Sequence, residues 1–137
     1  MKQNKLALLF PTAVMTADID TIPQQDHDYL LGCDYHQDDQ STGGQFQQTT
    51  DTYVLDHGAA TLRSWIELQL AIFGLEVMAT DTPLRITQSW CLKHQHCAQR
   101  LYQHCHPNSV VSGAYYVQAS ETSQRLRFHR NDPAAGQ

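Results

Sequence analysis

Residues 104–117 have the sequence HCHPNSVVSGAYYV, and this stretch decides the predicted fold. Its second half is rich in β-branched and aromatic side chains, which are typical of strands. The neighbouring residues 101–106 form another candidate strand, and in residues 125–129 Leu126 and Phe128 alternate with polar side chains. The C-terminal third of the chain is therefore predicted to be made mainly of strands.

The preceding part of the chain has a helical pattern. A long helix is predicted over residues 59–79, where apolar side chains recur with a helical period, and Asp56 is expected to cap its start. Residues 26–35 suggest a short helix, the Gln- and Gly-containing residues 37–52 suggest a loop, and alternation from Leu84 suggests a half-buried strand. Helices followed by strands predict an α+β, mainly β chain in which the helix packs on a sheet or partial barrel.

Length and charge narrow the possible classes. A chain of 137 residues suits a single domain, 1–137. With 14 Asp and Glu against 9 Lys and Arg, it lacks the basic surface that nucleic-acid binding needs. Residues 1–17 superficially resemble a secretory signal, but Pro11 interrupts the apolar run, and no run reaches the roughly 20 apolar residues of a membrane span. We expect a cytoplasmic protein with four reduced cysteines.

The side chains with the clearest potential for chemistry are His104 and His106. Residues two apart in a strand point to the same face, so both imidazoles would project together. Imidazole binds iron, zinc, copper and nickel, which makes the pair a candidate metal site. The alternative is a pair of solvated surface histidines.

Two other interpretations use the cysteines. A zinc-binding module could draw on the His/Cys cluster of residues 94–106, which contains His94, His96 and Cys97, although the spacing fits no standard zinc finger. Nucleophilic catalysis by Cys105 is not favoured, because in a strand this side chain would face away from both neighbouring histidines.

Several residues after the histidine pair have two interpretations. Asn108 and Ser109 could hydrogen-bond a cosubstrate or shape a turn after Pro107. Tyr115 and Tyr116 are expected to be packing residues, as is Trp90, and only one of the two tyrosines can face the interior of a strand pair.

Several short stretches of the sequence resemble a family of 2OG-Fe(II) oxygenases found in marine bacteria and cyanophages. The run of residues 104–117 is similar to the central motif of that family almost position for position. Further similarities cover LFPT at 9–12, ITQSW at 86–90 and FHRNDP at 128–133, and YVL at 53–55 is a weaker match.

The resemblance implies a double-stranded β-helix, a cupin-like jelly roll with flanking helices. It implies the cofactors Fe(II) and 2-oxoglutarate, with His104 and His106 as metal ligands. Asn108, Ser109 and Tyr115 are then candidate contacts of the cosubstrate. The implied activity is the oxidation of an unknown substrate, with hydroxylation as the expected reaction.

Members of the family continue beyond the segment that resembles FHRNDP, with strands that supply a distal histidine and a basic residue for 2-oxoglutarate. Here the sequence ends at Gln137, so we expect the N-terminal portion of such a fold. Metal binding is predicted for this portion, and turnover is not. Pairing of open strand edges between copies would make a homo-oligomer, which is a further hypothesis.

Overall fold

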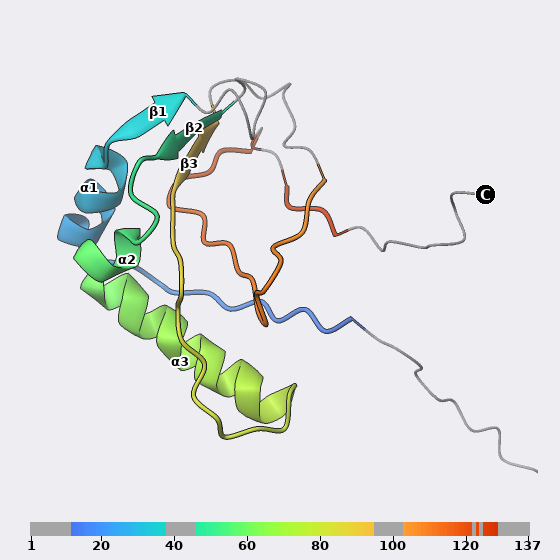
Figure 1. The fold of residues 1–137 in the computed structure, drawn as a ribbon. Helices are drawn as coiled ribbons and strands as arrows, with labels where there is room; N and C mark the ends of the chain where they lie inside the picture. Colours follow the sequence, from blue (N-terminus) through green and yellow to red (C-terminus); the bar gives the residue numbers. More distant parts are fainter. Residues whose placement is uncertain (1–11, 38–45, 95–102, 122, 124, 129–137) are drawn as a thin grey trace, which may run out of the picture.

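The computed structural model describes residues 12–37, 46–94, 103–121, 123 and 125–128. These ranges contain a three-stranded antiparallel sheet flanked by helices (Figure 1). The helices are α1 (Gln24–Gly32), α2 (Val54–His57) and α3 (Ala60–Glu76), and the strands are β1 (Tyr35–Gln37), β2 (Phe46–Thr49) and β3 (Leu92–His94). The predicted mixed α+β class is confirmed, but within these ranges the helices hold more residues than the strands, so the expected predominance of strands is not seen there.

The sheet has the order β1-β2-β3, so β2 is its central strand. Tyr35 pairs with Thr49 on one side, and Phe46 pairs with His94 on the other. Beyond the sheet, a parallel bridge joins Tyr53 to Ser89. The segment that leads into β3 therefore pairs with the residue that precedes α2 before it enters the sheet.

A small apolar core holds the helices together. Leu30 of α1, Val54 of α2, Leu62 of α3 and Ala59, which immediately precedes α3, are all buried and form one cluster. Partly buried side chains, Trp65 and Tyr115 among them, pack against this cluster from α3 and from the C-terminal segment. Among the helices in the described ranges, none is long and apolar enough to cross a membrane.

Helix α3 confirms the predicted long helix, but the expected cap by Asp56 is wrong. The residue before the helix is Ala59, whose backbone is left-handed at φ 53° and whose side chain forms no capping hydrogen bond. Asp26 of α1 takes this role: its Oδ2 accepts hydrogen bonds from the backbone N–H of Thr61 at 2.9 Å and of Leu62 at 3.1 Å. Asp56 instead forms an ion pair with Arg63.

Three predicted boundaries need correction. The short helix predicted over residues 26–35 begins at Gln24, just after Pro23, and ends at Gly32. Tyr35 already belongs to β1. The predicted loop contains the strand β2, which pairs with a strand on each side and whose Phe46 and Thr49 are buried. The predicted strand from Leu84 is mostly unpaired extended chain, with a bridge at Ser89 and a ladder only over β3.

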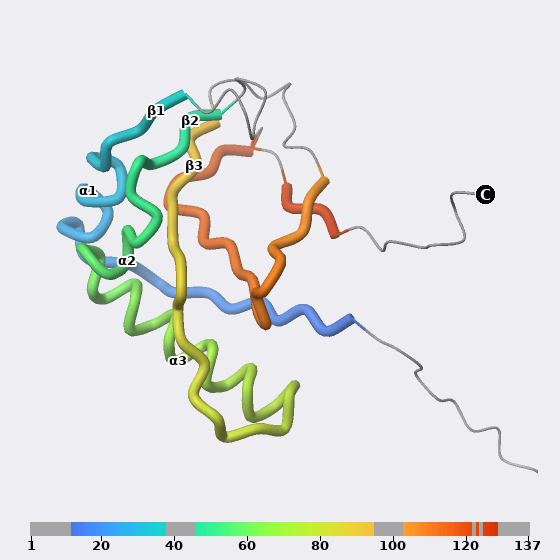
Figure 2. The backbone as a smooth tube through the Cα atoms, viewed as in Figure 1, coloured from blue at the N-terminus to red at the C-terminus, as the bar shows by residue number. Residues whose placement is uncertain are grey.

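The C-terminal strands predicted at 101–106, 110–117 and 125–129 are not present within the residues that the structure describes. Residues 103–117 instead run toward the N-terminal segment and back toward β3 as an open loop (Figure 2). Strands need a partner along their length, and the backbone hydrogen bond from Ser109 N to His106 O joins residues only three apart. The double-stranded β-helix stays a prediction.

Candidate metal site

A tight turn follows the histidine motif. Pro107 and Asn108 occupy the turn, Asn108 has a left-handed backbone at φ 65°, and Ser109 N donates to His106 O at 3.3 Å. Asparagine tolerates this conformation better than most residues. The Ser109 hydroxyl donates to Val111 O at 2.7 Å. These contacts are those of the turn interpretation, and a cosubstrate role for Asn108 and Ser109 stays a prediction.

The structure brings His104 and His106 together without a strand. Their ring centroids lie 5.1 Å apart, with the ring planes tilted by 54°. Both side chains are exposed. Two neighbouring imidazoles are a candidate pair of metal ligands, since imidazole nitrogen binds first-row metals, at about 2.0–2.1 Å in zinc sites.

Trp90 restrains one of these rings. Its indole stacks on the His106 imidazole, with centroids 5.4 Å apart and planes 24° from parallel. Trp90 is held in turn because Cys91 is bonded to β2: Thr49 N donates to Cys91 O at 3.0 Å, and Cys91 N donates to Thr49 Oγ1 at 3.1 Å. The sheet therefore positions the aromatic face that orients His106.

A third metal donor is not found among the described residues, where no group of three His, Cys, Asp or Glu side chains could hold a metal. His94 stacks on Phe46 at 4.5 Å within the sheet. His96, Cys97 and His129 lie outside the described ranges. Among the described residues, His104 and His106 therefore form a pair without a third donor, and the zinc-binding alternative is not favoured.

The described cysteines are free thiols with different surroundings. Cys105, between the two histidines, is exposed, whereas Cys33 and Cys91 are partly covered. Burial raises the pKa of the Cys91 thiol and of the Cys33 thiol. A raised pKa disfavours the thiolate, so neither of these two residues has the environment of a reactive cysteine.

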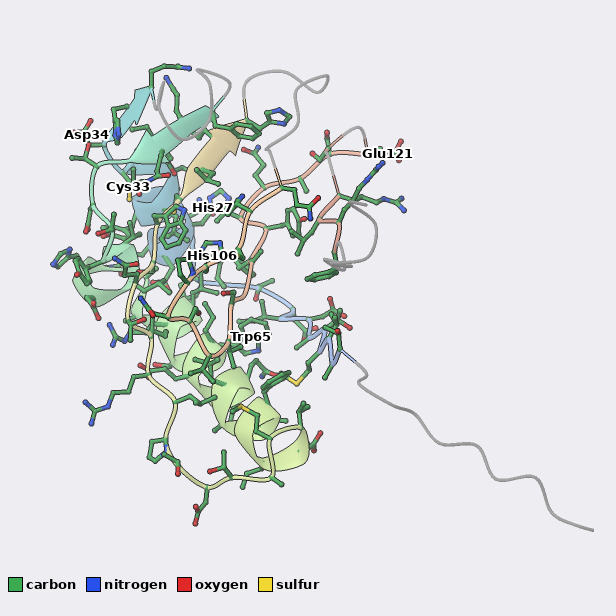
Figure 3. All side chains as sticks on the ribbon, turned by 45° about the vertical axis from the view of Figure 1, so that its right-hand side comes forward. His27, Cys33, Asp34, Trp65, His106 and Glu121 are labelled. Atoms are coloured by element: carbon green, nitrogen blue, oxygen red, sulfur yellow. The ribbon has the colours of Figure 1, made fainter. Side chains whose placement is uncertain are left out.

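Tyr115 makes packing contacts. Its ring packs against the core and meets Trp65 edge to face, with centroids 6.2 Å apart and planes at 63°. Figure 3 labels Trp65, which belongs to α3, and His106, which belongs to the C-terminal segment. The packing role predicted for Tyr115 agrees with these contacts. Sequence reasoning missed that Trp65 and Asp18 border a pocket with Tyr115, because these residues are far apart in the chain.

Comparison with known proteins bears on the C-terminal part of the chain. Residues 88–137 match a family model described as "Putative 2OG-Fe(II) oxygenase". No curated protein and no solved structure gives a significant match. The matched segment contains Trp90, His104 and His106, the three residues of the stacked histidine site. The predicted resemblance to a 2OG-Fe(II) oxygenase family is confirmed for residues 88–137, which match this model.

Proposed function

We propose that this protein is an Fe(II)- and 2-oxoglutarate-dependent oxygenase-type protein in which His104 and His106 are metal ligands. One observation carries the proposal: the two rings of the family segment lie 5.1 Å apart beside each other. An imidazole pair is part of the usual ligand set of non-haem iron oxygenases, which leaves positions open for the cosubstrate and dioxygen. The substrate that is oxidised is unidentified.

Iron(II) and 2-oxoglutarate, when bound, would supply oxygen activation coupled to decarboxylation: one oxygen atom enters the substrate as a hydroxyl group, and the other ends in succinate as carbon dioxide leaves. The protein contributes the orientation of its ligands. Trp90 limits rotation of the His106 ring by stacking on it at 5.4 Å. A restrained imidazole loses less freedom on binding the metal, which raises the affinity.

The described residues supply no third metal donor beside the two histidines. A third donor and a basic group for the 2-oxoglutarate carboxylate are needed, and a second copy of the chain is one source of them. Asn108 and Ser109 are the proposed polar contacts of the cosubstrate, since they follow His106 in the same turn.

Removing either imidazole should weaken metal binding. We expect His104→Ala and His106→Ala each to lower the affinity for cobalt(II), a redox-stable substitute for iron(II), by about tenfold or more. Titration followed by the visible absorption of cobalt(II) measures this affinity. His36→Ala is the matched control, because His36 is an exposed histidine in β1, where its ring lies 3.4 Å from the Thr50 hydroxyl.

Cys105→Ser separates the oxygenase site from the zinc-binding alternative. Cys105 is exposed and adjoins both histidines in sequence, so its thiolate would be a ligand of a zinc module but not of the proposed iron site. We expect the serine variant to bind cobalt(II) as the wild type does. Unchanged binding in both histidine variants, with loss in Cys105→Ser, would contradict the proposal.

A further inference from the structure

A pocket separate from the histidine pair lies where three parts of the chain meet. It is bounded by residues 17–19, by Trp65 of α3 and by residues 114–116, and its volume is about 290 Å³. In Figure 1 the N-terminal segment, drawn in blue, crosses the orange segment that contains residues 114–116. Sites for drug-sized ligands measure roughly 300–1,000 Å³, so this pocket suits a small head group.

Three of the residues that line the pocket are aromatic, and each of the three rings has a contact that holds it in place. Trp65 and Tyr115 pack against the core and meet at 63° with centroids 6.2 Å apart, which makes an aromatic corner. Tyr116 is 53% exposed, but its hydroxyl accepts a hydrogen bond from Leu126 N at 3.1 Å. These rings therefore need little reordering to receive a ligand, and that lowers the cost of binding.

The residues that line the pocket include one charged side chain. Asp18 lies on its rim as an exposed carboxylate, and none of the described residues that line the pocket is basic. The chain as a whole has a formal charge of −5. A carboxylate beside aromatic faces, whose π-systems are negative, favours a cation over a neutral or anionic ligand.

We propose that this pocket binds the ammonium head group of a small organic cation. Trp65, Tyr115 and Tyr116 provide ring faces for the alkyl groups around the nitrogen, and Asp18 supplies the opposite charge. Quaternary ammonium groups are bound by aromatic cages of this composition. Binding here requires no metal, so the proposal does not depend on the oxygenase function.

Choline is the test ligand, compared with its neutral analogue in which carbon replaces the nitrogen. Calorimetry of the metal-free protein measures the affinities, and proton NMR records the choline methyl groups. We expect the methyl resonances to move upfield, because ring faces shield them. The neutral analogue should bind about tenfold more weakly, since it has the same shape without the charge.

Variants assign the binding to this pocket. Asp18→Asn and Tyr116→Leu should each weaken choline binding about fivefold, and Asp18→Asn should also reduce its dependence on salt. Both residues are exposed, so neither change removes core packing. Asp20→Asn, an exposed aspartate on the same segment that does not line the pocket, is the matched control and should bind as the wild type does.

Three results would overturn the proposal in protein that circular dichroism shows to be folded. The first is no choline binding at millimolar concentration. The second is equal affinity for choline and the neutral analogue, which would make the pocket an uncharged apolar hollow. The third is binding that Asp18→Asn and Tyr116→Leu leave unchanged. Each result leaves the metal titrations of His104 and His106 unaffected, so the two proposals fail separately.

Discussion

Gly58→Ala is expected to lower the free energy of unfolding by about 2–3 kcal/mol, because the new methyl group has no room. A Cβ at Gly58 would lie 2.5 Å from Cε1 and Cζ of Tyr29. The tyrosine ring cannot easily withdraw, since its hydroxyl donates to Val54 O at 3.0 Å and its backbone belongs to α1. Either α1 or the turn between α2 and α3 must therefore move.

Urea unfolding followed by circular dichroism measures this loss. Gly32→Ala is the matched control: a Cβ there meets nothing within 4 Å, so its effect should be small or slightly stabilising. Adding Gly58→Ala to a Tyr29→Ala background should cost less than it does in the wild type, because the clashing ring is gone. Equal losses from Gly58→Ala in both backgrounds would show that the Tyr29 ring is not the cause.

Asp26→Ala should destabilise the protein by about 2–3 kcal/mol, since it leaves the start of α3 without its acceptor. Asp26 is buried, with 7% of its surface exposed. Its Oδ2 accepts hydrogen bonds from both Thr61 N and Leu62 N. Its negative charge also lies at the positive end of the helix dipole. Ala59, with its left-handed backbone, offers no side-chain bond in compensation.

Two comparisons isolate the capping interaction in the same unfolding experiment. Asp28→Ala removes an exposed aspartate of the same helix, whose bond to Gln24 lies at the surface, and should change the stability by less than about 0.5 kcal/mol. Asp26→Asn keeps an acceptor but loses the charge, so an intermediate loss is expected. If Asp26→Ala proves no more damaging than Asp28→Ala, the long-range cap does not stabilise α3.

The sequence predicted what depends on neighbours along the chain. Helix α3 was predicted because its apolar period is a local property, and it spans Ala60–Glu76. β2 was missed because two of its four residues are glutamines, so its own sequence has no strand pattern. It is a strand because it pairs with Tyr35–Gln37 on one side and Leu92–His94 on the other. The cap of α3 was misassigned for the same reason: Asp26 is 35 residues from Thr61.

The candidate site shows the same division. His104 and His106 were predicted to lie together, and their rings do so, although the described chain forms no strand there. A spacing of two residues was therefore a sound guide to proximity even though the local structure behind the prediction was wrong. The stacking of Trp90 on His106 joins segments on either side of β3, and no local pattern in the sequence could have indicated it.

The most direct test of the oxygenase proposal is anaerobic titration of the protein with iron(II) and 2-oxoglutarate, recording visible absorption. We predict a charge-transfer band that is lost in His104→Ala and His106→Ala and retained in His36→Ala. The band requires both molecules at one centre, so it tests the metal pair and the cosubstrate together. A folded wild-type protein without the band, or a band that survives both histidine substitutions, would contradict the assignment of His104 and His106 as the iron ligands.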